Sequence, residues 1–96
     1  MIKHEEFLRL CHRKVAENEN KRTDIKEKID ADDVFLVWSC KTLQNSKCLM
    51  STPVKGAYYY EFTYNGDKGE IYMVAYTKVE NIHLNENGKI IVERIK

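Results

Sequence analysis

The chain has 96 residues, of which 43% are hydrophobic and 32% charged, so its size and composition are those of one soluble globular domain. Sixteen basic and fifteen acidic residues leave a formal net charge of +1, which gives no reason to expect non-specific binding to DNA or anionic lipid. The first residues lack the apolar stretch of a signal peptide, and the longest apolar run, Val34 to Trp38, is too short to span a membrane. Three cysteines cannot all pair within one chain, which favours free thiols in a reducing cytoplasm.

An N-terminal helix is predicted from about residue 3 to residue 18. Its apolar residues recur at spacings of three, four and seven, which places them on one helical face. Glu5 and Glu6 lie in the first turn, where negative charge suits the helix dipole. A helix of this length is marginal alone and must pack on another element. The residues that would do so are Phe7, Leu8, Leu10, Cys11 and Val15.

Residues 19–33 form a polar connection in which Ile25 and Ile29 are the only large apolar residues. Asp24 followed by Glu27 resembles a weak capping box, so one short helical turn and a mobile connection are both open interpretations. Aspartates at positions 30, 32 and 33 are of the residue type that hard cations prefer, but the glycine and closing glutamate of a calcium loop are missing. Solvated charges before a strand are the interpretation we adopt.

The next segment predicts a first hairpin. Val34 to Trp38 is nearly all apolar, which is typical of a central strand covered on both faces, with Trp38 in the core. The strand continues to Leu43, and Gln44 to Ser46 forms a turn because asparagine tolerates left-handed geometry. A second strand follows from Lys47 to Thr52 and stops at Pro53, the only proline.

An aromatic hairpin follows, in which two tyrosine-rich runs flank Gly66–Gly69. A type I turn with Gly69 left-handed would pair Tyr64 with Tyr72, Phe62 with Val74 and Tyr60 with Tyr76. A four-residue loop would instead set Tyr60 and Phe62 beside Met73 and Ala75, because a slip of one residue reverses the faces of one strand. We prefer the first register because Gly69 fits its left-handed position.

The last hairpin is indicated by Asn87-Gly88, the pair most typical of a two-residue turn with positive φ at both positions. Leu84 should then face Ile91, and His83 should face Val92. The whole chain therefore predicts an α+β fold, with an N-terminal helix packed on an antiparallel sheet of about five strands in a hairpin meander. We expect a single domain over residues 1–96, comprising the helix, the connection over 19–33 and the sheet over 34–95.

Two groups of residues are candidates for binding. Tyrosines on a sheet can pack in the core, form a protein interface or stack nucleic-acid bases, and core packing is the most common of these roles. The turn from Lys41 to Lys47 gathers polar groups that could bind a phosphate or a partner protein, although it lacks the glycines of a phosphate loop. The binding residues that we predict are Lys41, Gln44, Asn45, Lys47, Tyr59 and Tyr76.

No catalytic or metal-binding pattern is present. The cysteines and histidines do not follow zinc-ligand spacing, and no local motif orients a base toward a thiol. We therefore expect no enzymatic activity, no cofactor and no bound metal. The residues considered are Cys11, Cys40, Cys48, His4, His12 and His83.

Two stretches resemble a family of small proteins encoded by bacteriophages and prophages and filed as a domain of unknown function. They are DVFLVWSCKTLQNSKCLMST, over Asp33–Thr52, and YYYEFTYNGDKGEIYMVAYTKVEN, over Tyr58–Asn81, with a weaker match in the N-terminal helix. KTLQN and YNGDKGEIY are the most specific parts, and the last hairpin departs from the family pattern. The resemblance implies a phage or prophage protein acting in the bacterial cytoplasm. It carries over no catalytic residue.

These observations predict a non-enzymatic binding protein whose partner is a host or phage protein, with inhibition of a host defence protein as one form of that activity. The alternative is a nucleic-acid or nucleotide binder that uses the tyrosine-rich sheet face. Neither reading involves a membrane. The oligomeric state is left open by the sequence.

Overall fold

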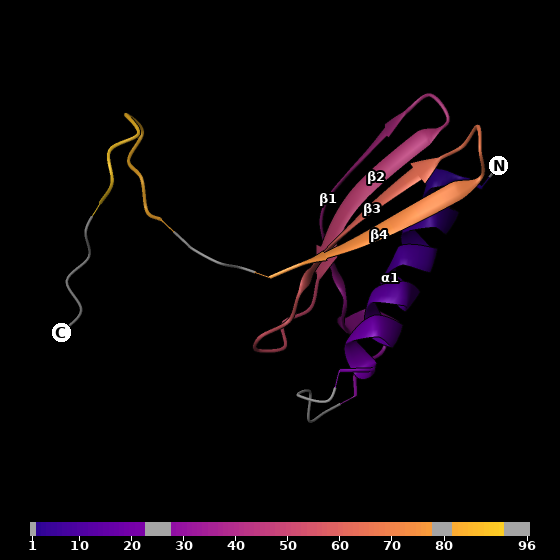
Figure 1. Cartoon of the computed structure of the whole chain (residues 1–96), viewed down its shortest axis with the longest axis horizontal. Helices are drawn as coiled ribbons and strands as arrows, with labels where there is room; N and C mark the ends of the chain where they lie inside the picture. Colours follow the sequence, from indigo (N-terminus) through magenta and orange to yellow (C-terminus); the bar gives the residue numbers. More distant parts are fainter. Residues whose placement is uncertain (1, 23–27, 78–81, 92–96) are drawn as a thin grey trace.

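A computed structural model describes residues 2–22, 28–77 and 82–91. It contains a helix, α1 (His4–Asn20), a short 3₁₀ turn, η1 (Ala31–Asp33), and four strands. The strands are β1 (Phe35–Thr42), β2 (Asn45–Ser51), β3 (Tyr59–Asn65) and β4 (Glu70–Tyr76), as Figure 1 shows. The predicted α+β class is confirmed, but the antiparallel sheet has four strands rather than about five.

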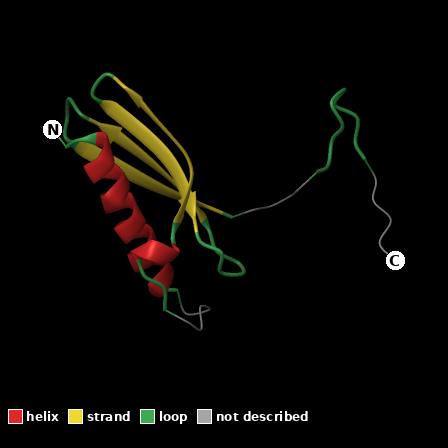
Figure 2. Cartoon of the chain, turned by 180° about the vertical axis from the view of Figure 1, so that it is seen from behind, coloured by secondary structure: helices red, strands yellow, loops and turns green. Residues whose placement is uncertain are grey.

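The sheet is a meander in which strands adjacent in sequence are adjacent in space, in the order β1-β2-β3-β4. Every neighbouring pair is antiparallel, so short turns suffice for the two hairpins β1–β2 and β3–β4. The helix crosses one face of this sheet, as seen in Figure 2, and within the sheet it packs mainly on the middle strands β2 and β3. The edge strands β1 and β4 are therefore covered less.

The core lies between α1 and the middle strands. The predicted apolar stripe of the helix is buried at Phe7, Cys11 and Val15, whereas Leu8 and Leu10 at its margins are half-buried. The Phe7 ring stacks on that of Tyr64, with centroids 5.8 Å apart. The sheet residues that complete the core are Cys48 and Met50 of β2 and Tyr60, Phe62 and Tyr64 of β3, with Val34 before β1.

The prediction that Val34 to Trp38 begins a central strand is wrong. β1 is an edge strand, and Trp38 is 40% exposed instead of lying in the core. Its outer neighbour is absent because the meander places the first strand at one end of the sheet. The helix also leaves most of β1 exposed, because it packs mainly on the middle strands.

The preferred register of the aromatic hairpin is also wrong, and the alternative register is the correct one. Tyr59 pairs with Tyr76 and Phe62 with Met73, across a four-residue loop between Asn65 and Glu70. The Asn65 side chain explains this loop, because its Oδ1 accepts hydrogen bonds from the backbone N–H groups of residues 67 and 68. Gly69 does adopt the expected left-handed geometry, with φ of 66°.

The first hairpin turns one residue earlier than predicted. Thr42 pairs with Asn45, so the turn consists of Leu43 and Gln44, and Asn45 already belongs to β2. Leu43 has a φ of 57°, which is an uncommon and strained conformation for a bulky side chain. The Lys41 Nζ donates a 2.5 Å hydrogen bond to the Leu43 carbonyl and helps to hold this turn.

The last hairpin forms, but with a different register. Leu84 bridges to Ile90, and the Ile91 N–H donates to the His83 carbonyl at 2.8 Å. Only Gly88 has positive φ, because Asn85 caps a longer loop through its side chain. The predicted partner Val92 lies outside the described residues, as do Asp24, Ile25 and Glu27 of the connection.

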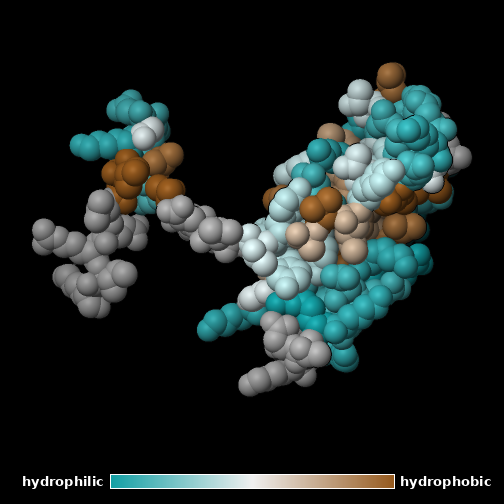
Figure 3. Space-filling view, viewed as in Figure 1, coloured by the Kyte–Doolittle hydropathy of each residue, from teal (hydrophilic) through white to brown (hydrophobic). Residues whose placement is uncertain are grey.

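The apolar residues of the last hairpin are exposed (Figure 3). They are Ile82, Leu84, Ile90 and Ile91.

A buried polar cluster fixes the C-terminal end of α1 on the sheet. Glu19 is fully buried and forms a 3.1 Å ion pair with Arg22. The Tyr60 hydroxyl donates to the Glu19 carboxylate and accepts a 2.9 Å hydrogen bond from the Asn18 amide. Arg22 also donates to the Gly56 carbonyl and lies over the Tyr58 ring, 3.8 Å from its centroid. This cluster joins the helix, β3 and the β2–β3 connection.

Replacing Arg22 by alanine should lower the free energy of unfolding by about 3–5 kcal/mol, because it leaves the Glu19 carboxylate buried without its cation. Lys14→Ala is the matched control, since its i,i+3 ion pair with Glu17 is about half-exposed, whereas Arg22 and Glu19 side chains are 14% and 0% exposed. The control should change stability by less than about 1 kcal/mol. Urea denaturation of both variants measures the difference, and equal effects would show that the buried pair is not important.

The buried Tyr60 hydroxyl should make stability depend on alkaline pH. Burial and the hydrogen bond to Glu19 raise the pKa of Tyr60 from 10.0 to about 12. Between these values the unfolded chain loses the tyrosine proton while the folded chain keeps it, so the free energy of unfolding should fall as pH rises. Tyr60→Phe should remove this part of the pH dependence. Urea midpoints from pH 8 to 12 for both proteins would contradict the assignment if the two slopes were the same.

Candidate functional site

The side of the sheet opposite α1 is its most distinctive surface, and we call it the open face. Side chains alternate along a strand, so the residues between those that pack on the helix belong to this face. In β2 and β3 the helix-facing residues are the buried ones at alternate positions, from Ser46 to Met50 and from Tyr60 to Tyr64. The open face consequently comprises Trp38, Cys40, Thr42, Lys47, Leu49, Tyr59, Glu61, Thr63, Glu70, Tyr72, Val74 and Tyr76.

The strand register arranges these side chains in rows across the sheet. One row joins Trp38, Leu49, Glu61 and Val74, and the row beside it joins Cys40, Lys47, Thr63 and Tyr72. Tyr59 and Tyr76 lie opposite each other in a third row. Figure 3 shows hydrophobic and pale side chains exposed over the strands, with hydrophilic groups around them. Tyr72 is the most exposed of the aromatics, at 59%.

Charge on the open face is sparse and mostly paired. The Lys47 ammonium lies 3.6 Å from the Glu61 carboxylate in the neighbouring strand. The Tyr72 hydroxyl donates a 2.6 Å hydrogen bond to Glu70, and this bond raises the pKa of Tyr72. The centre of the face therefore has one cation beside one anion, surrounded by aromatic and aliphatic groups.

Three of the six predicted binding residues meet on this face. Lys47, Tyr59 and Tyr76 all project from it, with Tyr59 half-buried and Tyr76 exposed. Tyr59 and Tyr76 had been expected on opposite faces, and the correct register puts them side by side. A shallow hollow, lined in part by Cys40, Lys47 and Thr63, lies at one end of the same surface.

The other three predicted residues lie at or near the tip of the β1–β2 hairpin. Gln44 donates a hydrogen bond to Asp67, and the Asn45 side chain accepts one from the Gly66 N–H at 3.2 Å. A Cβ at Gly66 would lie 2.1 Å from the Gln44 carbonyl oxygen, so only glycine allows this approach. Lys41 lies on the helix side of β1 and caps the Leu43 carbonyl. Gln44 and Asn45 therefore join the β1–β2 tip to the β3–β4 tip, whereas Lys41 supports the turn of its own hairpin.

The sequence did not identify Trp38, Tyr72 or Val74 as surface residues. Trp38 was placed in the core because its strand was predicted to be central. Tyr72 was paired with Tyr64 in the register that proved wrong. The Asn65 side chain, which caps the loop, was the signal for the correct register. The register that this cap favours puts Tyr72 and Val74 on the same face as Tyr59.

The cysteines and histidines have structural surroundings. Cys11 and Cys48 are buried, and a hydrogen bond to Cys48 together with burial raises the pKa of Cys11. His4 lies 3.0 Å from the Ser46 hydroxyl and 3.4 Å from that of Ser39, so it bridges α1, β1 and β2. Within the described residues, no three His, Cys, Asp or Glu side chains gather as a metal site.

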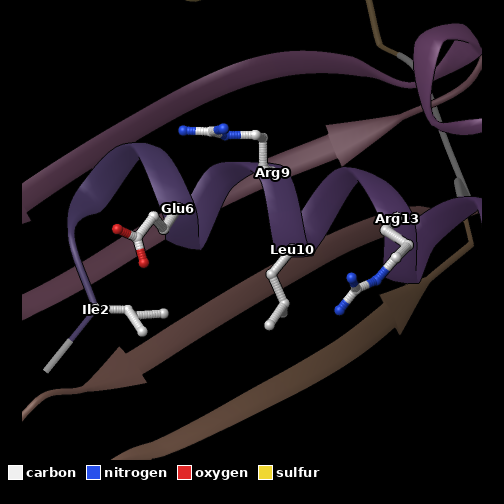
Figure 4. Close-up of a pocket in the computed structure, with 5 residues that line it drawn as sticks. All are labelled: Ile2, Glu6, Arg9, Leu10 and Arg13. Atoms are coloured by element: carbon white, nitrogen blue, oxygen red, sulfur yellow. The ribbon is translucent and has the colours of Figure 1, made fainter.

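A second hollow runs along the outer side of α1, lined by Ile2, Glu6, Arg9, Leu10 and Arg13. In Figure 4, Arg9 points to the opposite side of the helix from Leu10, so the charged groups do not converge on one position. The helix is amphipathic and charged, and in the described part of the chain no helix has the length and apolarity needed to cross a membrane. The open face remains the best candidate surface.

Comparison with known proteins gives one match. The model of a family described as a family of unknown function, DUF6275, matches residues 8–86, which include most of α1 and all four strands. No curated protein and no solved structure matches the chain. The function has to be argued from the geometry of the surface.

Leu43→Gly should stabilise the protein by roughly 0.5–1 kcal/mol, because it removes the cost of a left-handed L-residue, about 1–2 kcal/mol, at a smaller entropic penalty. Thr42→Gly is the control at the adjacent strand position, where glycine should destabilise by about 0.5–1 kcal/mol. Urea denaturation of the two variants measures both changes. A destabilisation by Leu43→Gly as large as that of the control would show that the turn is not strained.

Proposed function

The chain belongs to DUF6275, a family of unknown function, and we propose from its open face that it is a non-enzymatic protein that binds another protein. The observation that carries this proposal is the set of exposed apolar and aromatic side chains on an uncovered sheet face, with Trp38, Val74 and Tyr76 among them. Monomeric soluble proteins rarely leave such surfaces contiguous, and larger ones usually mark contact sites.

The composition of the face suits a protein partner. Tyrosine and tryptophan give large contact area with few rotatable bonds, and they are enriched among the residues that dominate binding energy. Lys47 and Glu61 lie within a central pair, where they can fix the orientation of a partner without needing long-range attraction. Polar hairpin tips at one end would form the rim of such an interface.

A nucleic-acid or nucleotide binder is the second candidate, because exposed aromatic rings on a sheet can stack bases. The arrangement of Tyr59, Tyr72 and Tyr76 on one face supports it. Phosphate binding needs cations, however, and on the described open face Lys47 already lies beside Glu61 while Glu70 adds a further negative charge. We therefore place protein binding first.

The phage or prophage origin implied by the sequence resemblance is part of the same proposal. It would put the protein in the bacterial cytoplasm, where a host protein, such as one that acts in defence against phage, is the proposed partner. A protein that acts by covering a surface of its partner needs no catalytic group. The aromatic and aliphatic side chains of the open face suit such binding. The KTLQN and YNGDKGEIY stretches would serve this role indirectly, since they build the joined hairpin tips.

The test compares two variants in the same strand. Tyr76→Ala removes an open-face side chain that is 46% exposed, and Met73→Ala removes a helix-side residue that is 41% exposed. After a bacterial partner is recovered by pull-down, Tyr76→Ala should weaken binding by about 2 kcal/mol or more, the loss that defines an interface hot spot, and Met73→Ala by much less. Affinity is measured by calorimetry on purified components.

Salt separates the two candidate functions. A protein partner held by packing should bind almost equally at 50 and 200 mM salt, whereas several phosphate contacts would cost about 10³-fold or more in affinity. Co-purified nucleotide with steep salt dependence would favour the second candidate. Equal binding by both variants to a protein partner would show that the contact surface lies elsewhere.

A further inference from the structure

The chain contains the dipeptide Asn-Gly twice, in two hairpin turns with different surroundings. Asn65-Gly66 lies at the end of β3, and Asn87-Gly88 lies in the turn of the last hairpin. When glycine follows asparagine, its main-chain nitrogen can readily attack the asparagine side-chain amide, because glycine has no Cβ to obstruct the approach. Whether this reaction takes place in a folded protein depends on the freedom of both groups, and the two turns differ in this respect.

The fold holds both reacting groups at Asn65-Gly66. The Asn65 Oδ1 accepts hydrogen bonds of 3.1 and 3.3 Å from the backbone N–H groups of residues 67 and 68. The Gly66 N–H, whose nitrogen would attack, donates to the Asn45 Oδ1 at 3.2 Å. A Cβ built on Gly66 would lie 2.1 Å from the Gln44 carbonyl oxygen, so this backbone lies directly against the neighbouring hairpin tip and has no room to rotate.

The same groups are exposed at Asn87-Gly88. Both residues lie on the surface, and a Cβ built on Gly88 would meet no atom within 4 Å. The Asn85 side chain accepts hydrogen bonds from the N–H groups of Asn87 and Lys89, whereas the Asn87 side chain has no hydrogen bond to any described residue. The Gly88 N–H donates to the Asn85 carbonyl at 2.9 Å. Attack by the Gly88 nitrogen therefore requires this one exposed hydrogen bond to break.

The last hairpin should also open more easily than the joined hairpin tips. Its described residues form one isolated bridge, between Leu84 and Ile90, and an isolated two-stranded hairpin is at best marginally stable in water. The turn after β3 belongs to a four-stranded sheet, and opening it must also separate Gln44 from Asp67 of the neighbouring tip. Because weakly packed segments open locally at low free energy, Asn87 should reach a reactive geometry far more often than Asn65.

We propose that Asn87 is a site of spontaneous deamidation and that the contacts of the hairpin tips protect Asn65 from the same reaction. Solvent base takes the Gly88 amide proton, and the nitrogen then forms a bond with the Asn87 Cγ. The Cγ–Nδ2 bond breaks, and Nδ2 takes up a proton from water and leaves as ammonia, so that a succinimide ring remains. Water opens this ring at either carbonyl, which gives aspartate or, by attack at the main-chain carbonyl, isoaspartate.

The modification changes the charge and the backbone of the last hairpin. A carboxylate replaces the amide, so the formal net charge of the chain falls from +1 to 0. In isoaspartate the main chain also runs through the former side chain, which alters the spacing that the hydrogen bonds between Asn85 and Lys89 require. No residue of the open face takes part, so this proposal does not depend on the binding function proposed above.

The first test measures both asparagines in the same wild-type chain. The folded protein is incubated at mildly alkaline pH and digested at acidic pH, and mass spectrometry of the separated peptides distinguishes asparagine, aspartate and isoaspartate at each position. Asn87 should convert at least tenfold faster than Asn65, because its turn opens more often. In concentrated urea, where both turns are lost, the two rates should approach each other. Equal rates in the folded protein, or the same preference for Asn87 in urea, would overturn the proposal.

The second test releases the protected dipeptide. Asn45→Ala removes the acceptor of the Gly66 N–H, and should raise the rate at Asn65 severalfold while the rate at Asn87 in the same protein stays unchanged. Asn20→Ala is the matched control, because it removes an asparagine that bonds the Ile29 backbone at the C-terminal end of α1, and it should change neither rate. Circular dichroism checks that both variants fold. An unchanged rate at Asn65 in folded Asn45→Ala, or an equal rise in the control, would overturn the protection by the tips.

Discussion

The width of a single helix limits how much of the sheet can be buried, and this limit determines which apolar residues of the protein are exposed. An α-helix with its side chains is about 10 Å wide, and strands are about 4.8 Å apart, so α1 can cover roughly two strands. It lies on β2 and β3, where the buried aromatic and sulfur-containing side chains are found. The apolar residues of β1, β4 and the open face are exposed because no second layer exists among the described residues.

The position of α1 over the middle strands depends on polar groups as well as on apolar packing. A buried apolar stripe alone would allow the helix to slide, since hydrophobic contact is not directional. Glu19 can satisfy its carboxylate only where Tyr60 and Arg22 both reach it. At the other end, His4 lies between hydroxyls of β1 and β2. These contacts fix both ends of the helix along the sheet.

Parts of this arrangement follow from the sequence because they depend on local rules. The spacing of Phe7, Cys11 and Val15 was sufficient to predict both the helix and its buried face. The four strands of the sheet were found for the same reason, but the common face of Tyr59 and Tyr76 was not, because the preferred register put these two residues on opposite faces. Which strand is central is not a local property. An apolar run indicates that its side chains should be buried, but it does not say which element buries them. That is why Trp38 was placed in the core.

Other features depend on single side chains that compete with a general rule. Asn65 and Asn85 cap the loops that follow them, and each shifts its hairpin away from the register that the glycines alone suggest. The burial of Glu19 could not be inferred, since a glutamate near the end of an amphipathic helix is ordinarily solvated. The ion pair with Arg22 is local in sequence, but the Tyr60 hydroxyl can reach the Glu19 carboxylate only when the helix packs on β3.

The order of elements along the chain has a consequence for folding. Each pair of neighbouring strands is joined by a short connection, so the sheet can grow by local hairpins as the polypeptide is made. The helix is synthesised first, but its contacts lie far downstream: Glu19 and Tyr60 are 41 positions apart. The apolar stripe of α1 therefore stays in contact with solvent or with a chaperone until β3 has left the ribosome. The helix, although it is synthesised before the strands, can therefore be placed only after its partner strands β2 and β3 have formed.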